Sequence, residues 1–435
     1  MSALRAPLAA LVALAPALAS GAGPHLDPVA SVVMHLALIL VAAKLGGEVA
    51  TRAGQPAVLG ELLAGVVLGN VSLLGPGGLE AMKTDPTLDM LSRLGVLLLL
   101  FEVGLESTVR DMLRVGPSAL LVAVLGVAAP FALGWGVGLL LVPGAGPYVH
   151  AFLGAALSAT SVGITARVLQ DLGRSQTPEA RIILGAAVID DVLGLVILAV
   201  VGGVIAAAGQ GGTLSGWSVG AIVGKATLFL AGSLALGVVL SPRVFRLGAR
   251  LRTRGVLLTM GLAFCFFLSW LAGAIGLAPI VGAFAAGLIL EDVHDQEFVD
   301  RGEHGLEELV KPIGAFLVPV FFVLMGMRTD LRSFGDPAVL GLAGALTLAA
   351  ILGKQLCAAG VLGRGLDRLT VGIGMVPRGE VGLIFANVGL SLQLDGRPLL
   401  APSMYSALVI VVIVTTLVTP PALRWSLGRR PSGNA

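Results

Sequence analysis

The stretch GQPAVLGELLAGVVL, residues 54–68, occurs a second time in altered form as GLAPIVGAFAAGLIL, residues 276–290. Five residues of the first copy recur at one constant offset, so that Gly54, Gly60, Ala64, Gly65 and Leu68 correspond to Gly276, Gly282, Ala286, Gly287 and Leu290. Two further matches follow in order, residues 104–105 with 326–327 and residues 162–164 with 381–383. Self-similarity over most of a chain reflects its architecture. The sequence therefore predicts a fold built from two related halves.

The composition predicts that both halves lie in a membrane. Of the 435 residues, 56% are hydrophobic and 12% are charged, with a mean hydropathy of +0.96, whereas soluble domains contain about 25% charged residues. Because a helix needs about 20 apolar residues to cross the hydrocarbon core, we expect an all-α polytopic membrane protein. About thirteen spans are predicted, at approximately residues 28–47, 57–74, 88–106, 118–142, 148–172, 180–208, 217–241, 255–275, 278–291, 309–327, 337–361, 369–391 and 402–423.

The N-terminal segment, residues 1–24, precedes these spans. It contains one arginine, an apolar region and the small-residue ending Ala17-Leu18-Ala19. This order is typical of a cleavable signal peptide. The alternative is an extra hydrophobic helix.

The arginines predict which side of the membrane each loop faces. Loops after odd-numbered spans are rich in arginine, and the largest group follows the seventh span: Arg243, Arg246, Arg250, Arg252 and Arg254. Because positively charged loops stay in the cytoplasm, we expect a cytoplasmic C-terminus. The same rule explains the basic clusters without nucleic-acid binding.

The repeat pairs spans 1–6 with spans 8–13 and leaves the seventh span as a linker. An odd number of spans between equivalent positions gives the two halves opposite orientations, as in many secondary transporters. We therefore expect four regions after the N-terminal segment: a first inverted repeat at 25–208, a linker helix and basic loop at 209–250, a second inverted repeat at 251–425 and a short cytoplasmic tail at 426–435.

Two of the predicted spans contain helix-breaking residues. SATSVGITA, residues 158–166, is rich in hydroxyl and glycine residues, and MVPRGEVGL, residues 375–383, places Pro377 and Gly379 at mid-membrane depth. Regular helical hydrogen bonding cannot continue there, so the released backbone groups need other partners. Arg378 and Glu380 could supply them.

Two adjacent aspartates lie inside the sixth span, in AAVIDDVLGLVI, residues 186–197. A charged residue inside a span costs at least about 2.5–3.5 kcal/mol on insertion scales and usually marks an ion pathway. Asp190 and Asp191 repel each other in a low dielectric, which a proton relieves, and their oxygens also suit a small cation such as sodium. A site that holds either a proton or a cation has the chemistry of an exchanger.

Two other charged residues are candidates for the same region. Lys354, in AILGKQLCA, is expected to pair with Asp190 or Asp191 and to release it when the cation arrives. The alternative is that the ammonium group extends to the membrane surface. Glu102 is expected to form a structural ion pair with Arg378 or Lys354.

Taken in order, these segments resemble the bacterial monovalent cation:proton antiporters, in the branch that includes the sodium/proton antiporter NapA. The resemblance covers about residues 50–425 and rests on PAVLGELLAGVVLG, LLLLFEVGLE, LSATSVGITARVL, VIDDVLGLVIL, LGKQL and GMVPRGEVGLIFA. It implies a bacterial inner-membrane protein that forms a homodimer through spans 1–3 and 8–10. It also implies a transport core of spans 4–6 and 11–13 with two crossed broken helices.

The resemblance also implies a role for each site residue. Asp191 is the main carrier of the cation and the proton, Asp190 is its neighbour and Lys354 is its partner. Thr160 and Ser161 lie where the first broken helix is expected. The potassium-efflux members carry a nucleotide-binding domain, which we do not expect here because the sequence continues for only about a dozen residues after the last predicted span.

The predicted function is therefore exchange of sodium or lithium for protons by alternating access, and electrogenic exchange is favoured. Potassium/proton exchange on the same fold is the alternative, and a cation channel or sensor is a further one. No enzymatic activity, catalytic residue or cofactor is expected. The partners are the transported ions and the lipid bilayer.

Overall fold

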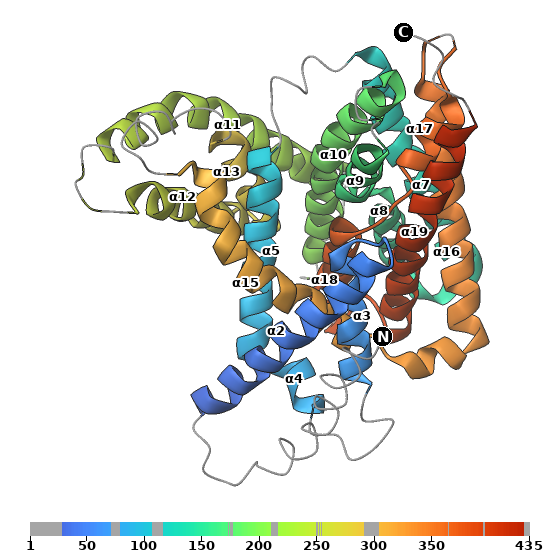
Figure 1. Cartoon of the computed structure of the whole chain (residues 1–435), viewed down its shortest axis with the longest axis horizontal. Coiled ribbons are helices and arrows are strands. Elements are labelled where there is room, and N and C mark those ends of the chain that lie inside the picture. Colours follow the sequence, from blue (N-terminus) through green and yellow to red (C-terminus); the bar gives the residue numbers. More distant parts are fainter. Residues whose placement is uncertain are drawn as a thin grey trace. The chain divides into compact units, whose positions relative to one another are not determined.

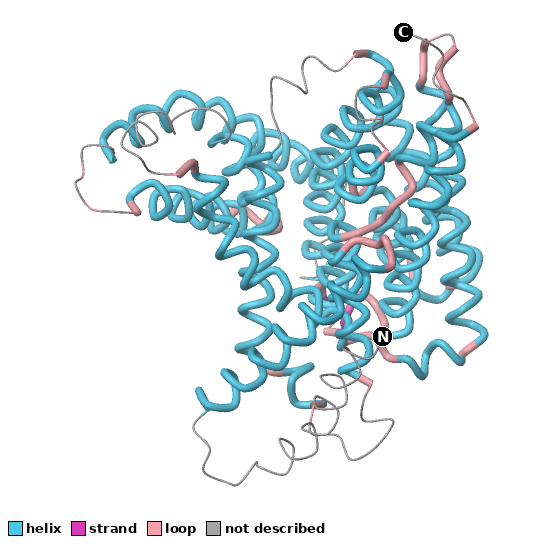
Figure 2. The backbone as a smooth tube through the Cα atoms, in the orientation of Figure 1, coloured by secondary structure: helices cyan, strands magenta, loops and turns pink. Residues whose placement is uncertain are grey.

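The computed structural model of the chain describes residues 28–70, 79–106, 116–172, 174, 177–209, 216–248, 251, 253, 255–290, 304–363, 365–394 and 396–429. Nearly all of these residues are helical (Figure 2). The α-helices are α2 (Pro28–Arg52), α3 (Ala57–Gly69), α4 (Glu80–Thr84), α5 (Pro86–Glu106), α7 (Pro117–Leu141), α8 (Pro147–Ser158), α9 (Val162–Asp171), α10 (Pro178–Gly209), α11 (Gly216–Gly248), α12 (Val256–Ala274), α13 (Pro279–Leu290), α15 (Leu306–Met327), α16 (Pro337–Leu356), α17 (Arg368–Gly374), α18 (Glu380–Ser391) and α19 (Pro402–Gly428).

Short elements complete the fold between the helices. Three 3-10 turns are present among the described residues, η2 (Pro143–Ala145), η3 (Leu331–Gly335) and η4 (Cys357–Gly360). The strands β1 (Gln393–Leu394) and β2 (Arg397–Pro398) pair antiparallel, with Gln393 opposite Pro398. This hairpin lies between α18 and α19.

Seven of the described helices are long and apolar enough to cross a membrane, and a bent pair of segments within α11 would add an eighth. Each lies at a predicted span, and α3, α13 and residues 381–391 form shorter apolar helices. The expectation of a multi-pass helical membrane protein is thus confirmed. The predicted signal segment at 1–24 and the last residues of the predicted tail, 430–435, lie outside the described residues.

The described helices belong to two compact units (Figure 1). The first unit is formed within residues 1–96 and 315–335, and the second within residues 97–314 and 336–435. In the first, α2 and α3 approach closely because Gly46 and Gly60 face each other, and a methyl group on either would meet the backbone of the other helix. An apolar cluster with Ile39, Leu88 and Val323 at its centre joins α2, α5 and α15.

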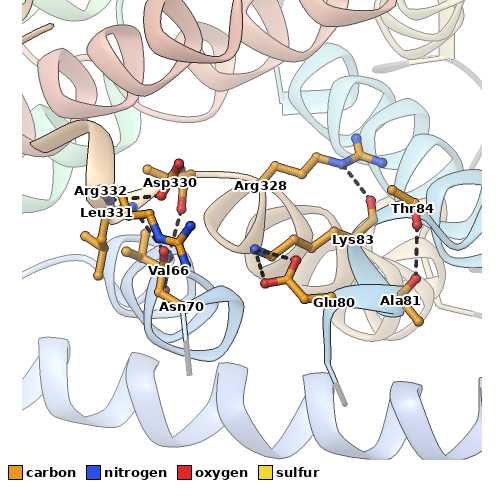
Figure 3. A network of polar contacts seen from close by, with 11 residues as sticks. Val66, Asn70, Glu80, Ala81, Lys83, Thr84, Arg328, Asp330, Leu331 and Arg332 are labelled. Atoms are coloured by element: carbon orange, nitrogen blue, oxygen red, sulfur yellow. Dashed lines mark hydrogen bonds and ion pairs between the residues drawn. The ribbon is translucent and has the colours of Figure 1, made fainter. Parts of the chain in front are cut away.

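A polar network lies at one end of the first unit (Figure 3). Asn70, which follows α3, donates its side-chain amide to the carbonyl oxygen of Thr329 at 2.8 Å and accepts from the Leu331 backbone N–H at 3.0 Å. Arg328 donates to the Lys83 carbonyl oxygen at 3.3 Å and forms an ion pair with Asp89 at 2.5 Å. These bonds fasten the ends of α3, α4, α5 and α15 at the edge of the apolar region.

The second unit contains the helices that build the candidate site. The central helix α7 packs against α8, α10 and α16, while α19 packs against α16, α17 and α18 (Figure 1). The apolar residues between α7, α10 and η4 include Val122, Ile183, Ala187 and Cys357, all buried. Any charged group placed among them therefore lies in a low-dielectric environment.

Candidate ion-binding site

Two helices of the second unit are interrupted in the middle of an apolar stretch, as the sequence predicted. The first interruption, residues 159–161, separates α8 from α9, and the second, residues 375–379, separates α17 from α18. Pro377 has no backbone N–H and disfavours helical geometry in the residue before it. The four helix ends at these interruptions expose backbone groups that need partners inside the protein.

The two interruptions supply partners to each other. The Ser161 backbone N–H donates to the Pro377 carbonyl oxygen at 2.8 Å. The hydroxyl of Thr165, in the first turn of α9, donates to the Gly374 carbonyl oxygen at 2.6 Å, at the end of α17. Segments more than 200 positions apart in the sequence thus meet inside the second unit.

Arg378 links the interruptions through its side chain. It is only 1% exposed, and its guanidinium donates to the Ala159 carbonyl oxygen at the end of α8. The carboxyl end of a helix carries a partial negative charge that a cation stabilises. The expected compensation of a broken helix by Arg378 is therefore supported by its position.

Asp190 and Lys354 form an ion pair inside the second unit. Asp190 lies in the middle of α10 and Lys354 in the last turn of α16, and their Oδ1 and Nζ atoms are 2.9 Å apart. Both residues are 0% exposed. This excludes the alternative in which Lys354 extends to the membrane surface, and it selects Asp190 over Asp191 as the partner. The second Asp190 oxygen, Oδ2, has no hydrogen-bond partner among the described residues.

A glycine on α7 makes room for the lysine. A methyl group on Gly126 would lie 3.4 Å from the Lys354 Nζ atom and 3.5 Å from the Cys357 Cβ atom. The ammonium group therefore lies directly against the backbone of α7, with little space for an additional side chain.

Asp191 and the first interruption complete the set of buried polar residues. Asp191 is 8% exposed, and as the next residue along α10 it points about 100° away from Asp190. Thr160 and Ser161 are each 1% exposed, and the Thr160 hydroxyl has no hydrogen-bond partner in the described part of the chain. These residues belong to the same unit as the ion pair.

The two remaining predicted site residues are the glutamates Glu380 and Glu102. Glu380 is the first residue of α18, and its side chain lies outside the described part of the molecule. Glu102 lies beside Gly314, close enough that a methyl group there would collide with its carboxylate. Its charged neighbours are Glu106, Glu307 and Lys311. Among the described residues, Glu102 forms no ion pair with Lys354 or Arg378, because its carboxylate lies beside α15, where its charged neighbours are different residues.

Sequence reasoning missed the hydroxyl groups of α19. Thr416 donates to the Arg378 carbonyl oxygen at 2.5 Å, and the Arg378 backbone N–H donates to the Thr415 hydroxyl at 3.3 Å. Both threonines are buried. The available signal was the pair of adjacent threonines in the otherwise apolar run VIVTTLV, residues 412–418.

The carboxylates of Asp190 and Asp191 supply hard oxygen ligands. Among the described residues there is no group of three or more His, Cys, Asp or Glu side chains that could hold a metal ion. A cation at Asp190 and Asp191 would therefore need hydroxyl, carbonyl or water oxygens as well, which suits a weakly held monovalent ion.

Buried charges next to interrupted helices, within a polytopic helical protein, define the class of secondary ion transporters. A family model described as "Sodium/hydrogen exchanger, transmembrane" matches residues 36–427, and the chain belongs to this family. This confirms the resemblance to the cation:proton antiporters that the motifs indicated.

Individual relatives agree with the family. The chain is 41% identical over 430 residues to the high-affinity Na(+)/H(+) antiporter NhaS3 of Synechocystis sp., with 91% of this chain and 89% of the relative covered. It is 36% identical to the Na(+)/H(+)-K(+) antiporter GerN of Bacillus cereus, with 91% and 96% covered. The solved structure of the sodium proton antiporter MjNhaP1 from Methanocaldococcus jannaschii has the same fold, with a TM-score of 0.70 at 16% identity over 92% of this chain and 98% of that chain.

Proposed function

We propose that the sodium/proton exchange of this family member takes place at Asp190 and Asp191, with Lys354 as the internal cation that competes with both ions. The observation that carries this proposal is the Lys354–Asp190 pair, 2.9 Å apart with both residues fully buried. A buried charge that loses its partner is costly. The pair therefore couples occupation of the carboxylates to the charge on the lysine.

The exchange cycle follows from competition at one site. Asp191 is the main carrier: it binds either a proton or a sodium ion, and the two states exclude each other. When sodium arrives, Asp190 contributes a second set of oxygens and releases Lys354. When sodium leaves, a proton returns to Asp191, and protonated Lys354 pairs with the ionised Asp190 again. No step allows sodium and the full set of protons to be bound together, so transport in one direction requires transport in the other.

Access to the site alternates between the two sides of the membrane. The supporting features are the two interrupted helices and their mutual bonds, since helix ends at mid-membrane depth offer backbone dipoles to an ion. We propose that these helices are crossed, and that they belong to two inverted six-helix repeats, residues 25–208 and 251–425, joined by the linker region 209–250. A homodimer formed through spans 1–3 and 8–10 is part of the same proposal.

The proposed topology has thirteen spans and a cytoplasmic C-terminus, and it can be tested with single cysteines. Thr253 lies between α11 and α12, and Arg397 lies between α18 and α19; both are exposed. An impermeant thiol reagent should label Thr253→Cys only from the cytoplasmic side and Arg397→Cys only from outside. The native Cys265 and Cys357 are buried and should react little. Labelling of both positions from one side would overturn the odd span count.

The transported ion is sodium or lithium, and the proton stoichiometry makes the exchange electrogenic. Two carboxylates and one ammonium give the site a formal charge of −1 when all three are ionised. A second proton per sodium is therefore carried by Lys354, which releases a proton when sodium occupies Asp190 and takes one up when sodium leaves. Potassium/proton exchange is the second candidate, because GerN, a relative with 36% identity, is named as a Na(+)/H(+)-K(+) antiporter. Transport by the purified protein in liposomes with sodium, lithium or potassium on one side distinguishes these ions.

The central test is the Asp191→Asn variant in the same liposomes. The amide keeps the size of the side chain but cannot carry a proton or hold sodium, so exchange should fall to the level of empty liposomes. Asp330→Asn, at an exposed aspartate of the first unit, is the matched control and should exchange normally. Normal sodium-driven proton movement by Asp191→Asn would overturn the proposal.

A further inference from the structure

The interruption between α17 and α18 is held by hydrogen bonds from two other segments. One is the interruption between α8 and α9, and the other is helix α19. The backbone of Arg378 is held on both sides of the residue: its N–H donates to the Thr415 hydroxyl and its C=O accepts from the Thr416 hydroxyl. Both threonines come from α19 and are no more than 3% exposed. In an apolar interior, such backbone groups must find a partner within the protein.

Thr416 uses its hydroxyl in an unusual way for a residue inside a helix. Threonines in helices commonly donate to the carbonyl oxygen four residues earlier. Thr415 does so toward Val411 at 2.8 Å, and Thr419 does so toward Thr415 at 2.7 Å. Thr416 instead donates to the Arg378 carbonyl oxygen of another segment, at 2.5 Å. Its hydroxyl therefore holds the interruption between α17 and α18 in place and forms no hydrogen bond within α19 among the described residues.

The side chain of Arg378 depends on this anchored backbone. Its guanidinium donates to the Ala159 carbonyl oxygen and interacts electrostatically with Asp190. Its Nε and Nη2 atoms have no hydrogen-bond partner in the described part of the chain. A guanidinium that could move would pair readily with a carboxylate, since bidentate pairing is its preferred geometry. Holding the backbone keeps the guanidinium bonded to the Ala159 carbonyl oxygen, so that it acts on Asp190 through its charge without pairing directly with the carboxylate.

We propose that Thr416, assisted by Thr415, is a positioning residue for sodium binding: it fixes the backbone of Arg378 so that the guanidinium caps α8 and does not compete with sodium for Asp190 and Asp191. This inference rests on the proposed function of the two aspartates. Thr416 does not touch the ion; it acts through Arg378. The effect is therefore on ion affinity more than on the number of turnovers at saturation.

The test is the initial rate of sodium-driven proton movement in liposomes, measured over a range of sodium concentrations. In Thr416→Val the hydroxyl is lost while the shape is kept, and the apparent KM for sodium should rise about five- to tenfold with a maximal rate within about twofold. The freed guanidinium also opposes protonation of the aspartates, so the pH profile should move to lower pH. Thr416→Ser restores the hydroxyl and should restore both properties.

Two controls separate positioning from general loss of structure. Thr419→Val removes a buried hydroxyl that bonds only within α19, and its KM and pH profile should match those of the unmodified protein. In an Arg378→Lys background, Thr416→Val should cause no further rise in KM, because the planar guanidinium is already absent. If Thr416→Val does not fold, Thr415→Val should give a smaller shift in the same direction.

The outcomes distinguish this inference from the proposed function. Absence of sodium/proton exchange by the unmodified protein would count against the proposed function itself. Normal exchange with an unchanged KM in Thr416→Val, or an equal shift in Thr419→Val, would overturn the role of Thr416 while leaving the aspartates untouched.

Discussion

The long helices α10 and α19 occupy matching places in the proposed repeat, yet they carry different chemistry. Asp190 and Asp191 in α10 correspond to Val409 and Ile410 in α19. Where α10 has carboxylates, α19 has buried hydroxyl groups about two to five turns further along, at Thr415, Thr416, Thr419 and Ser426. Both helices pack beside the interrupted helices of the second unit.

The difference shows that two helices at equivalent positions of the proposed repeat can have different roles. A carboxylate in an apolar interior is tolerated only with a partner, and α10 has one in Lys354. A hydroxyl costs far less and can satisfy a backbone group of a neighbouring helix. In the proposed mechanism, the ion chemistry is therefore concentrated on α10, and α19 maintains the backbone on which that chemistry depends.

The largest effect should follow from separating the charges of the α10 pair. Asp190→Asn leaves the Lys354 ammonium buried without a counter-charge, and we expect a loss of about 3–5 kcal/mol in the free energy of unfolding. The double variant Asp190→Asn, Lys354→Gln should recover part of this loss. Thermal unfolding of the purified protein in detergent measures both. Equal stability of the single variant and the unmodified protein would mean that the buried Lys354 ammonium does not depend on the charge of Asp190.

A slightly smaller effect should follow from giving α19 a carboxylate. Val409 is fully buried, and Lys354 is already paired with Asp190. Val409→Asp should therefore destabilise the protein by about 2.5–3.5 kcal/mol and lower the amount inserted in the membrane. Val409→Thr, of similar shape, is the control and should insert nearly normally. If the Val409→Asp variant inserted and exchanged like the unmodified protein, the distinction between the two helices would disappear.

Membrane voltage provides the next test. Each elementary charge moved across the membrane is worth about 2.3 kcal/mol per 100 mV, so exchange by the unmodified protein should respond to an imposed potential. Lys354→Gln should transport more slowly and lose most of this response if the lysine carries the extra proton. Initial rates in liposomes with and without a potassium diffusion potential give the answer. Retained voltage sensitivity in Lys354→Gln would assign the charge movement to the aspartates alone.

The smallest effect is expected at the far end of α19. The hydroxyl groups of Thr370 in α17 and Ser426 in α19 are 2.6 Å apart and buried. Because one neutral hydrogen bond contributes about 0.5–1.5 kcal/mol, Ser426→Ala should lower the stability by that amount and leave sodium exchange unchanged. An altered sodium KM in this variant would extend the functional part of α19 beyond the interruption.

The positions of the helices could largely be predicted from the sequence, because a membrane span is specified by the length of an apolar run. The interruptions could be predicted as well, since proline, glycine and hydroxyl residues stand where a regular helix cannot continue. α19 is longer than its apolar run, and reaches Gly428, because Ser426 and Leu423 are buried against α17 and α9 rather than exposed.

The partners inside the site were harder to predict. The charged residues inside the predicted spans indicate a lysine–aspartate pair. They do not distinguish Asp190 from Asp191 as the partner, because that depends on how α10 is rotated toward α16. The Ala159 carbonyl oxygen has no sequence signature, since every residue has a carbonyl group. For Glu102 the sequence indicates Arg378 or Lys354 as a partner, but Gly314 opens space for its carboxylate beside α15, near Glu307 and Lys311.

The bonds between the interruptions have a consequence for the direction of transport. Ser161, Thr165 and Arg378 each bind a backbone oxygen of the opposite segment, so the two interrupted helices should travel together without changing the oxygens that face the ion. An ion would then meet the same ligands from either side, with equal intrinsic affinity. We therefore expect transport to be symmetric. Reversing the sodium and proton gradients should reverse the direction of transport, and the half-saturating sodium concentration should be the same on both sides of the membrane.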